Sequence, residues 1–207
     1  SSVSAGIAVI NAQLDIPDLR YPVLHIKSLS TGTLQSIREF SIQSPINNIL
    51  GGQLDRVSVS GDASFTLDLT VPLNNANDFE FVARIRSNNG TLAIAGLNAP
   101  ITNLIGDVTI ERDLISSESL GGTFLGQSIA ISLDRSEDPR FTVVATVDGI
   151  VTADGLINEL GLPLEGLVGG AAQYQARILF PNAATEMPTP LTIQIKSEFE
   201  GFSFDFP

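Results

Sequence analysis

The chain has 207 residues, of which 43% are hydrophobic and 16% are charged, and its formal net charge is −12 at pH 7. An acidic chain repels phosphate backbones, so we expect no nucleic-acid partner. The absence of cysteine excludes disulfides and thiolate chemistry. The mean hydropathy is +0.23, yet no apolar run approaches the ~18 residues of a transmembrane helix. At this length the chain forms one large β domain or two small ones with a substantial core.

Two short features precede the long strands. Val23 to Ile26 form a strand-like run that contains His25, the only histidine. Further along, Ser44 followed by Pro45 predicts a short helical turn, because serine caps helix N-termini and proline is favoured in the first turn. No other element is predicted for residues 1–44.

The segment 57–71 has a strict period of two. Its odd positions are apolar or small, as at Val57 and Leu69, and its even positions are polar, as at Ser58 and Asp68. Successive side chains of a strand point to opposite faces, so we predict one strand with an apolar face and a polar face. Unbroken, it would be roughly 50 Å long at ~3.3 Å per residue. Its apolar face must be covered by another sheet or by a ligand.

The same alternation recurs along most of the remaining chain. Its apolar positions are Phe79, Phe81, Ala83 and Ile85; Ile129, Ile131 and Leu133; Phe141, Val143, Ala145 and Val147; Tyr174, Ala176, Ile178 and Phe180; Leu191, Ile193 and Ile195; and Phe202, Phe204 and Phe206. Turn-forming residues separate these runs at Asn74 to Asn77, Asn88 to Gly90, Gly121-Gly122, Ser136 to Pro139 and Pro181 to Pro190. We therefore predict an all-β fold, a long antiparallel sheet of hairpins and meanders with one or two short helices.

A short motif, Pro-apolar-x-x-apolar-apolar-Gly, occurs at 45–51, 100–106 and 163–169. Each copy precedes a new set of strands, as expected of stacked supersecondary units that share an apolar face. A turn that recurs without common descent would give the same pattern. We predict a single segment over residues 1–207, with repeat units starting near residues 45, 100 and 163.

The best helix candidate lies between Thr152 and Leu160. Apolar residues recur there at i, i+3, i+4 and i+7, counted from Ala153. Thr152 can cap the start and Gly161 the end. This helix is predicted to close one end of the β structure.

Residues that could carry chemistry are sparse. No activating partner for His25 is identifiable, so a structural role in a strand is favoured. Carboxylates lie near one another at Asp15 and Asp18, at Asp134, Glu137 and Asp138, and at Glu198 and Glu200. Solvated turns account for them, because the chain lacks the Trp typical of sugar-binding grooves and the central glycine of a calcium loop. We expect no enzymatic activity, no metal ion and no cofactor.

The remaining pattern places Val, Ile, Leu and Phe on one face of the strands and Ser, Thr and Asp on the other. A closed sandwich would cover two such faces with one another and serve as a structural or scaffolding module of an envelope or surface protein. A groove would leave its apolar face to a ligand. A carbohydrate-processing jelly roll is disfavoured by the absence of Trp.

Motifs along residues 45–207 occur in a distinctive order. They are Val59-Ser60-Gly61-Asp62, Leu67-Asp68-Leu69-Thr70-Val71-Pro72-Leu73, Asn89-Gly90-Thr91-Leu92, Asn98-Ala99-Pro100-Ile101-Thr102-Asn103-Leu104-Ile105-Gly106, Gly122-Thr123-Phe124-Leu125-Gly126-Gln127, Leu162-Pro163-Leu164 and Leu167-Val168-Gly169-Gly170-Ala171. In this order they resemble the middle-to-late portion of the large AsmA-like envelope proteins of Gram-negative bacteria, of the YhdP type.

The resemblance implies a protein anchored by one N-terminal inner-membrane helix, with a long periplasmic body. That body would be a U-shaped, jelly-roll-like β groove, along which phospholipids move toward the outer membrane. A lipid chain in a trough needs contiguous apolar lining but no catalytic residue or cofactor, which agrees with the alternating strands. We therefore expect a segment of a periplasmic lipid-transport bridge, with phospholipid acyl chains as its ligand.

The groove is expected to be lined by the odd-numbered apolar residues of 57–71 and by those of the later strands. The predicted lipid-binding residues are Val57, Val59, Phe65, Leu67, Leu69, Val71, Phe81, Ile85, Ile131, Val143, Val147, Ile178, Phe180, Ile193, Ile195, Phe202 and Phe204.

Overall fold

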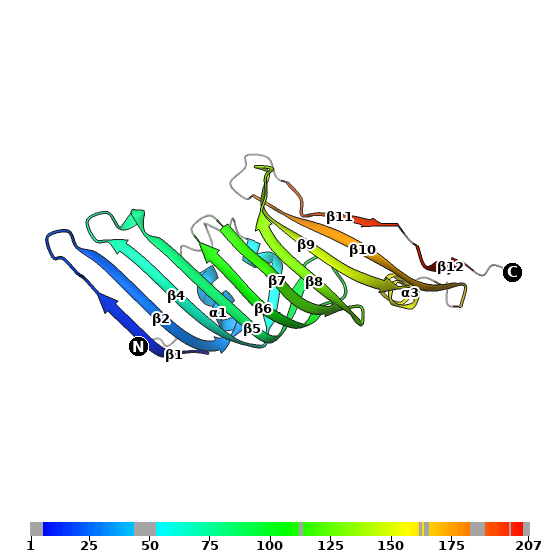
Figure 1. Cartoon of the computed structure of the whole chain (residues 1–207), viewed down its shortest axis with the longest axis horizontal. Coiled ribbons are helices and arrows are strands. Elements are labelled where there is room, and N and C mark those ends of the chain that lie inside the picture. The colour runs from blue at the N-terminus through cyan, green and yellow to red at the C-terminus, as the bar shows by residue number, and fades with distance from the viewer. Residues whose placement is uncertain are drawn as a thin grey trace.

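The computed structural model describes residues 6–43, 53–111, 114–161, 163, 166–182, 189–198 and 200–204. These residues form one antiparallel sheet of 12 strands (Figure 1). Its main path is β1-β2-β4-β5-β6-β7-β8-β9-β10-β11, while β3 pairs with β5 and β12 pairs with β10. The sheet is open, because this path ends at β1 and at β11. The prediction of an all-β fold with a long antiparallel sheet is confirmed.

The strands range from 3 to 15 residues in length. They are β1 (Ile7–Asp15), β2 (Val23–Thr33), β3 (Val57–Ser60), β4 (Asp62–Pro72), β5 (Glu80–Ile94), β6 (Ile101–Glu111), β7 (Leu114–Phe124), β8 (Gln127–Arg135), β9 (Phe141–Thr152), β10 (Val168–Pro181), β11 (Thr192–Ser197) and β12 (Phe202–Phe204). The helical elements are α1 (Leu34–Ile42), η1 (Gln53–Arg56), η2 (Ala76–Asp78) and α3 (Ala153–Leu160).

Along the main path, neighbouring strands are consecutive in the chain with one exception. β2 pairs directly with β4 from Val23↔Pro72 to Thr33↔Asp62, so α1, η1 and β3 form an excursion between two adjacent strands. The excursion returns through β3, which pairs with the far end of β5. It places α1 against one face of the sheet, behind the central strands in Figure 1.

The prediction of one unbroken strand over 57–71 is wrong. The segment forms β3 and β4, which are separated at Gly61. Gly61 has a φ of +111°, and a Cβ at this position would lie 2.5 Å from the carbonyl oxygen of Asn89. Close approach of the β5 backbone therefore requires glycine here and interrupts the strand. The alternation continues across the break, because odd residues of β3 and β4 lie on the same face of the sheet.

Two of the predicted turns do not separate strands but lie inside them. Asn88 to Gly90 form a bulge within β5, where a Cβ on Gly90 would lie 2.8 Å from Cδ1 of Leu34. Gly121-Gly122 lie within β7, where a Cβ on Gly122 would lie 2.8 Å from Cγ2 of Ile101. These glycines give room to neighbouring side chains rather than reversing the chain.

The predicted helix is confirmed as α3, and its caps are those expected. Thr152 Oγ1 accepts a hydrogen bond from Gly155 N at 3.1 Å, and Gly161 ends the helix in the left-handed conformation. Glu159 Oε1 accepts a hydrogen bond from Ala99 N at 2.9 Å, so α3 contacts the connection between β5 and β6. The helix is thereby attached to one end of the curled sheet. The turn predicted at Ser44-Pro45 and the first repeat copy lie outside the described residues.

Candidate functional site

One face of the sheet, here named the inner face, carries a continuous apolar surface from β4 to β10. The strand register aligns Phe65, Ile85 and Val108 across β4, β5 and β6. The next strands continue this surface, with apolar residues paired across β8, β9 and β10 on the same face, as at Val147 and Ala176. The continuity follows from the period of two, since paired residues of antiparallel strands share a face.

Helix α1 packs on this inner face through its own apolar side chains. Thr33 caps the helix, because its Oγ1 accepts a hydrogen bond from Ser36 N at 3.1 Å. Leu34 and Ile37 are buried and form a cluster with Ala63 of β4. The helix therefore covers part of the apolar face that the strands create.

An apolar cavity of about 230 Å³ lies between α1, η1 and the inner face. Its walls come from α1, η1, β3 and each strand from β5 to β10. Among the described residues that line it, only Arg38 and Ser41 have polar side chains. Ser41 Oγ donates a hydrogen bond to the carbonyl oxygen of Ile37, which satisfies this hydroxyl within the helix. The cavity walls are thus apolar, and Arg38 contributes the aliphatic stem of its side chain to them.

Eight of the 17 residues predicted to bind lipid line this cavity. They are Val57, Val59, Ile85, Ile131, Val143, Val147, Ile178 and Phe180. They come from five strands, from Val57 of β3 to Phe180 of β10, and the curl of the sheet brings them together. Their role in lipid binding remains a prediction.

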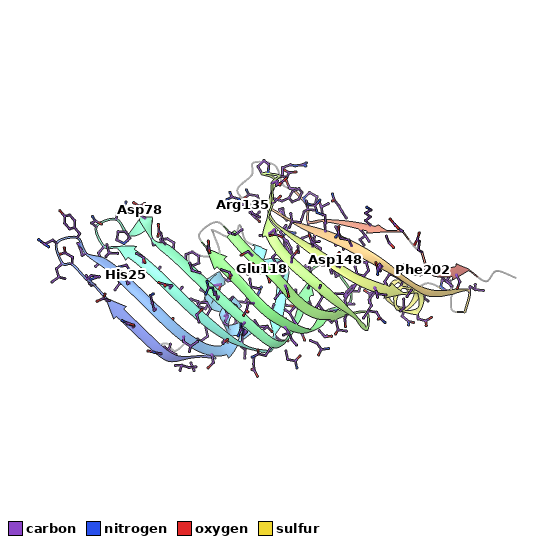
Figure 2. The ribbon with its side chains drawn as sticks, viewed as in Figure 1. His25, Asp78, Glu118, Arg135, Asp148 and Phe202 are labelled. Atoms are coloured by element: carbon purple, nitrogen blue, oxygen red, sulfur yellow. The ribbon has the colours of Figure 1, made fainter. Side chains whose placement is uncertain are left out.

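The other predicted residues lie away from the cavity. Phe65, Leu67 and Leu69 pack around Phe81 in a second cluster on the inner face. Val71 is half-buried near the end of β4. Ile193 and Ile195 lie on the edge strand β11, opposite Ile178 and Ala176, and Ile195 is 70% exposed. Phe202 and Phe204 belong to β12, which pairs with β10. Phe202 is labelled in Figure 2.

Sequence reasoning missed the part of the cavity formed by the excursion. Leu34, Ile37 and Arg38 of α1 and Leu54 of η1 line it, as do Leu92 and Ile94 of β5. A signal for α1 was present: Thr33 can cap a helix, and Leu34 and Ile37 lie three residues apart on one helix face. Leu92 and Ile94 were missed because the bulge at Asn88 to Gly90 shifts the alternation of β5 by one residue.

The outer face of the sheet is polar and carries paired charges. Arg86 donates two hydrogen bonds of 2.7 Å to the carboxylate of Asp107, and Lys27 Nζ lies 3.2 Å from Asp68 Oδ2. The hydrogen bond from Arg86 is the main cause that holds the pKa of Asp107 below its usual range. These charged pairs face solvent on the side opposite the cavity.

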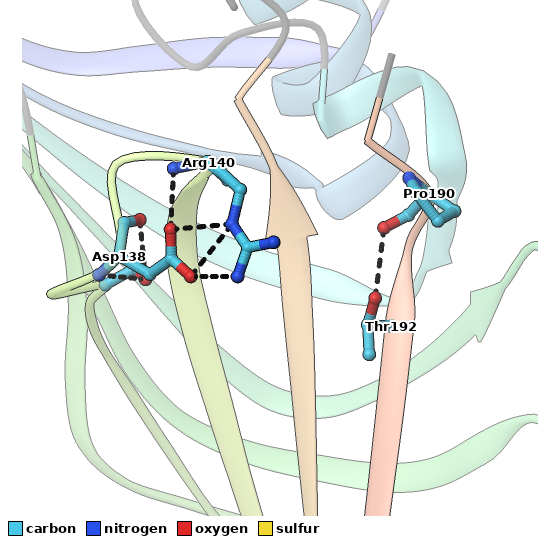
Figure 3. Close-up of polar contacts among 5 residues, drawn as sticks. Asp138, Arg140, Pro190 and Thr192 are labelled. Carbon is cyan, nitrogen blue, oxygen red and sulfur yellow. Dashed lines mark hydrogen bonds and ion pairs between the residues drawn. The ribbon is translucent and has the colours of Figure 1, made fainter. Parts of the chain in front are cut away.

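The residues considered for catalysis form no reactive cluster. His25 Nδ1 lies 3.2 Å from Thr70 Oγ1 on the outer face, and Figure 2 shows it far along the sheet from Asp148. Asp138 pairs with Arg140, whose side-chain hydrogen bonds lower the pKa of this carboxyl (Figure 3). Figure 3 also shows Thr192 Oγ1 donating to the carbonyl oxygen of Pro190, at the start of β11. No group of three metal-ligating side chains occurs among the described residues.

A second hollow of about 650 Å³ lies beside β10. Its lining includes Tyr174, Asp148, Lys196 and Glu198. Burial raises the pKa of the Tyr174 phenol. This hollow combines polar and apolar walls, unlike the cavity beneath α1.

Two sequence comparisons identify known proteins to which this chain is similar. The sequence profile of the YhdP protein family matches residues 4–207. The chain belongs to the YhdP family. It is also similar to the intermembrane phospholipid transporter YhdP of Escherichia coli (strain K12), at 23% identity over 210 residues. That alignment covers 90% of this chain and 16% of the relative, so the chain corresponds to a small part of the relative's length.

Two further observations concern known structures and membrane-spanning helices. No solved structure matches the chain. Within the part of the chain that the structure describes, neither helix has the length and apolar character needed to cross a membrane. The sequence-based recognition of a YhdP-type protein is confirmed by the family match.

Proposed function

We propose that this chain is a segment of a periplasmic lipid-transport bridge, in which the inner face shields phospholipid acyl chains from water. The observation that carries the proposal is the apolar inner face from β4 to β10, which includes a cavity lined almost entirely by Val, Ile, Leu and Phe. Membership of the YhdP family supports it, as does a relative named as an intermembrane phospholipid transporter. In this proposal the longer protein is anchored to the inner membrane and reaches toward the outer membrane.

The energetics of an apolar track suit transport better than tight storage. Each methylene removed from water contributes ~0.8 kcal/mol, so an acyl chain gains stabilisation along the whole inner face. Uniform apolar walls provide no directional contact that would fix one position of the chain. The cavity of about 230 Å³ is smaller than the ~300–1,000 Å³ of typical ligand pockets, so it suits part of an acyl chain rather than a whole lipid.

The open sheet also argues against the rival proposal of a closed structural sandwich. A sandwich requires a second sheet over the apolar face, whereas the described strands all belong to one sheet. Among the described residues, α1 and η1 cover the inner face next to the cavity, and they cover part of it. In this proposal the rest of the inner face receives the lipid.

Lipid binding can be tested by native mass spectrometry of gently purified protein. We expect co-purified phospholipid in the wild type and its loss in Ala145→Leu, because Ala145 lines the cavity between Leu133 and Ile178 and a larger side chain fills the space. Ala130→Leu is the matched control, since Ala130 is exposed on the outer face of β8. Wild-type protein that carries no lipid and binds no apolar dye would contradict the proposal.

A further inference from the structure

Arg38 has the one charged side chain among the described residues that line the apolar cavity. It lies on α1 and is half-buried, next to Ile37, which is 3% exposed and holds the helix on the inner face. The strand residues opposite it, from β5 to β10, are apolar. The cavity walls are almost entirely apolar, so Arg38 contributes its aliphatic stem to them and its guanidinium lies outside, beside the cavity.

The guanidinium of Arg38 is held in place but not neutralised. Its Nε donates a hydrogen bond of 2.8 Å to the carbonyl oxygen of Leu54, which ties α1 to η1. Within the described residues no carboxylate pairs with it and its two terminal nitrogens have no hydrogen-bond partner. A guanidinium has five N–H donors in a planar fork, so most of its donor capacity is unused.

Other arginines of the described chain differ in one of two ways. Arg20, Arg86 and Arg140 each form an ion pair with an aspartate. The remaining ones are exposed, where water satisfies their donors; they are Arg56, Arg84, Arg135 and Arg177. Arg38 alone is both half-buried and without an ion pair in the described chain.

Acidic residues close to Arg38 in the sequence leave it unpaired. Its neighbour Glu39 accepts a hydrogen bond from Gln35 Nε2 at 2.8 Å. Asp55, which follows Leu54, is exposed and forms no ion pair with Arg38. In a chain with net charge −12, a cation beside an apolar cavity is thus left available to an anion from outside.

We propose that Arg38 binds the phosphate group of a lipid whose acyl chain lies in the cavity. This inference rests on the proposed function, and it adds a headgroup site to the apolar track. The planar fork of a guanidinium matches two phosphate oxygens, and charge-assisted hydrogen bonds of this kind are the strong ones. The terminal nitrogens of Arg38, which have no partner among the described residues, would donate to the phosphate beside the cavity, while Ile37 and the sheet would cover the acyl chain.

The test compares two lipids that differ only in the phosphate: dioleoyl phosphatidic acid and dioleoylglycerol. Affinities are measured for wild-type protein, Arg38→Gln, Arg38→Met and the control Arg177→Gln, whose arginine is exposed on the outer face of β10. We expect the wild type and Arg177→Gln to prefer phosphatidic acid by about tenfold or more. Both Arg38 variants should lose this preference and keep their affinity for dioleoylglycerol. Arg38→Met is the second variant because its side chain keeps the packing of the arginine stem. It carries the test if Arg38→Gln lowers the melting temperature.

The outcomes separate this inference from the proposed function. Equal binding of the two lipids by the wild type, or a preference that survives in both Arg38 variants, would overturn the headgroup site and leave the apolar groove intact. Failure of the wild type to bind either lipid would overturn both. Competition by millimolar inorganic phosphate as strong as that by the lipid would show a site for free anions and would also overturn the inference.

Discussion

Two regions of the inner face have the same alternating sequence pattern but differ in how much of their side-chain surface other elements cover. Val147 of β9 is 6% exposed in the wall of the cavity, whereas Leu14 of β1 lies on the same face and is 65% exposed. Both are apolar residues at alternating positions of a strand. The difference teaches that alternation determines which face a side chain joins, while burial depends on the helix and the curl of the sheet above it.

The largest effect is expected when a charge is placed in the covered region. Val147→Asp buries a carboxylate without a partner and should cost about 3 kcal/mol or more of stability. Leu14→Asp, the matched change at the exposed edge, should leave the melting temperature nearly unchanged. Thermal unfolding followed by circular dichroism measures both. A near-normal melting temperature for Val147→Asp would show that water reaches β9 and that the two regions are alike.

An intermediate effect is expected at the break between β3 and β4. Gly61→Ala places a Cβ against the backbone of Asn89 and Gly90, in addition to the cost of a positive φ. Gly96→Ala is the control, because Gly96 has a φ of +99° and open space around it. We expect Gly96→Ala to cost about 1 kcal/mol and Gly61→Ala clearly more in denaturant titration. Equal losses of stability in the two variants would mean that the β5 backbone moves away from the added Cβ at position 61 without further cost.

The smallest effect is expected on the outer face. The hydrogen bonds from Arg86 depress the pKa of Asp107 in the folded protein, so the ion pair stabilises the fold above the usual pKa of a carboxyl. This stabilisation is lost as the pH falls through the depressed value. Asp107→Asn should therefore lower the melting temperature slightly at pH 7, and this decrease should shrink as the pH is lowered into the acidic range. The exposed pair is screened, so a decrease as large as that of Val147→Asp at pH 7 would contradict this reading of the outer face.

The strands of the second half were predictable because their pattern is local. β8, β9 and β10 alternate without a bulge over Ile131, Val147 and Ile178, and α3 has both of its capping residues in the sequence. An antiparallel sheet follows from such strands and the turns between them, whereas the same pattern left a closed sandwich and an open groove as alternatives. Lipid contact by the predicted residues, like the repeat units, stays a prediction.

The excursion was missed although the sequence carries a capping signal for α1, because that signal is weak. α1 is short, has a weak apolar stripe, and is held by contacts with Ala63, which is distant in sequence. Gly90 and Gly122 resemble turn residues, yet glycine serves close packing equally well, and only the neighbouring side chains distinguish the two uses. Arg38 likewise looks like an ordinary surface cation until η1 and the cavity are placed beside it.

The direct pairing of β2 with β4 has a consequence for the entropy of the unfolded chain. The segment between Thr33 and Asp62 must be closed as a loop before these strands can pair. Loop closure over this length costs about 2 kcal/mol more than closing a hairpin turn of a few residues. Every other seam of the main strand path joins strands that are consecutive in the chain. The pairing of β2 with β4 extends over two complete 11-residue strands, and this pairing offsets the entropy cost of closing the long loop.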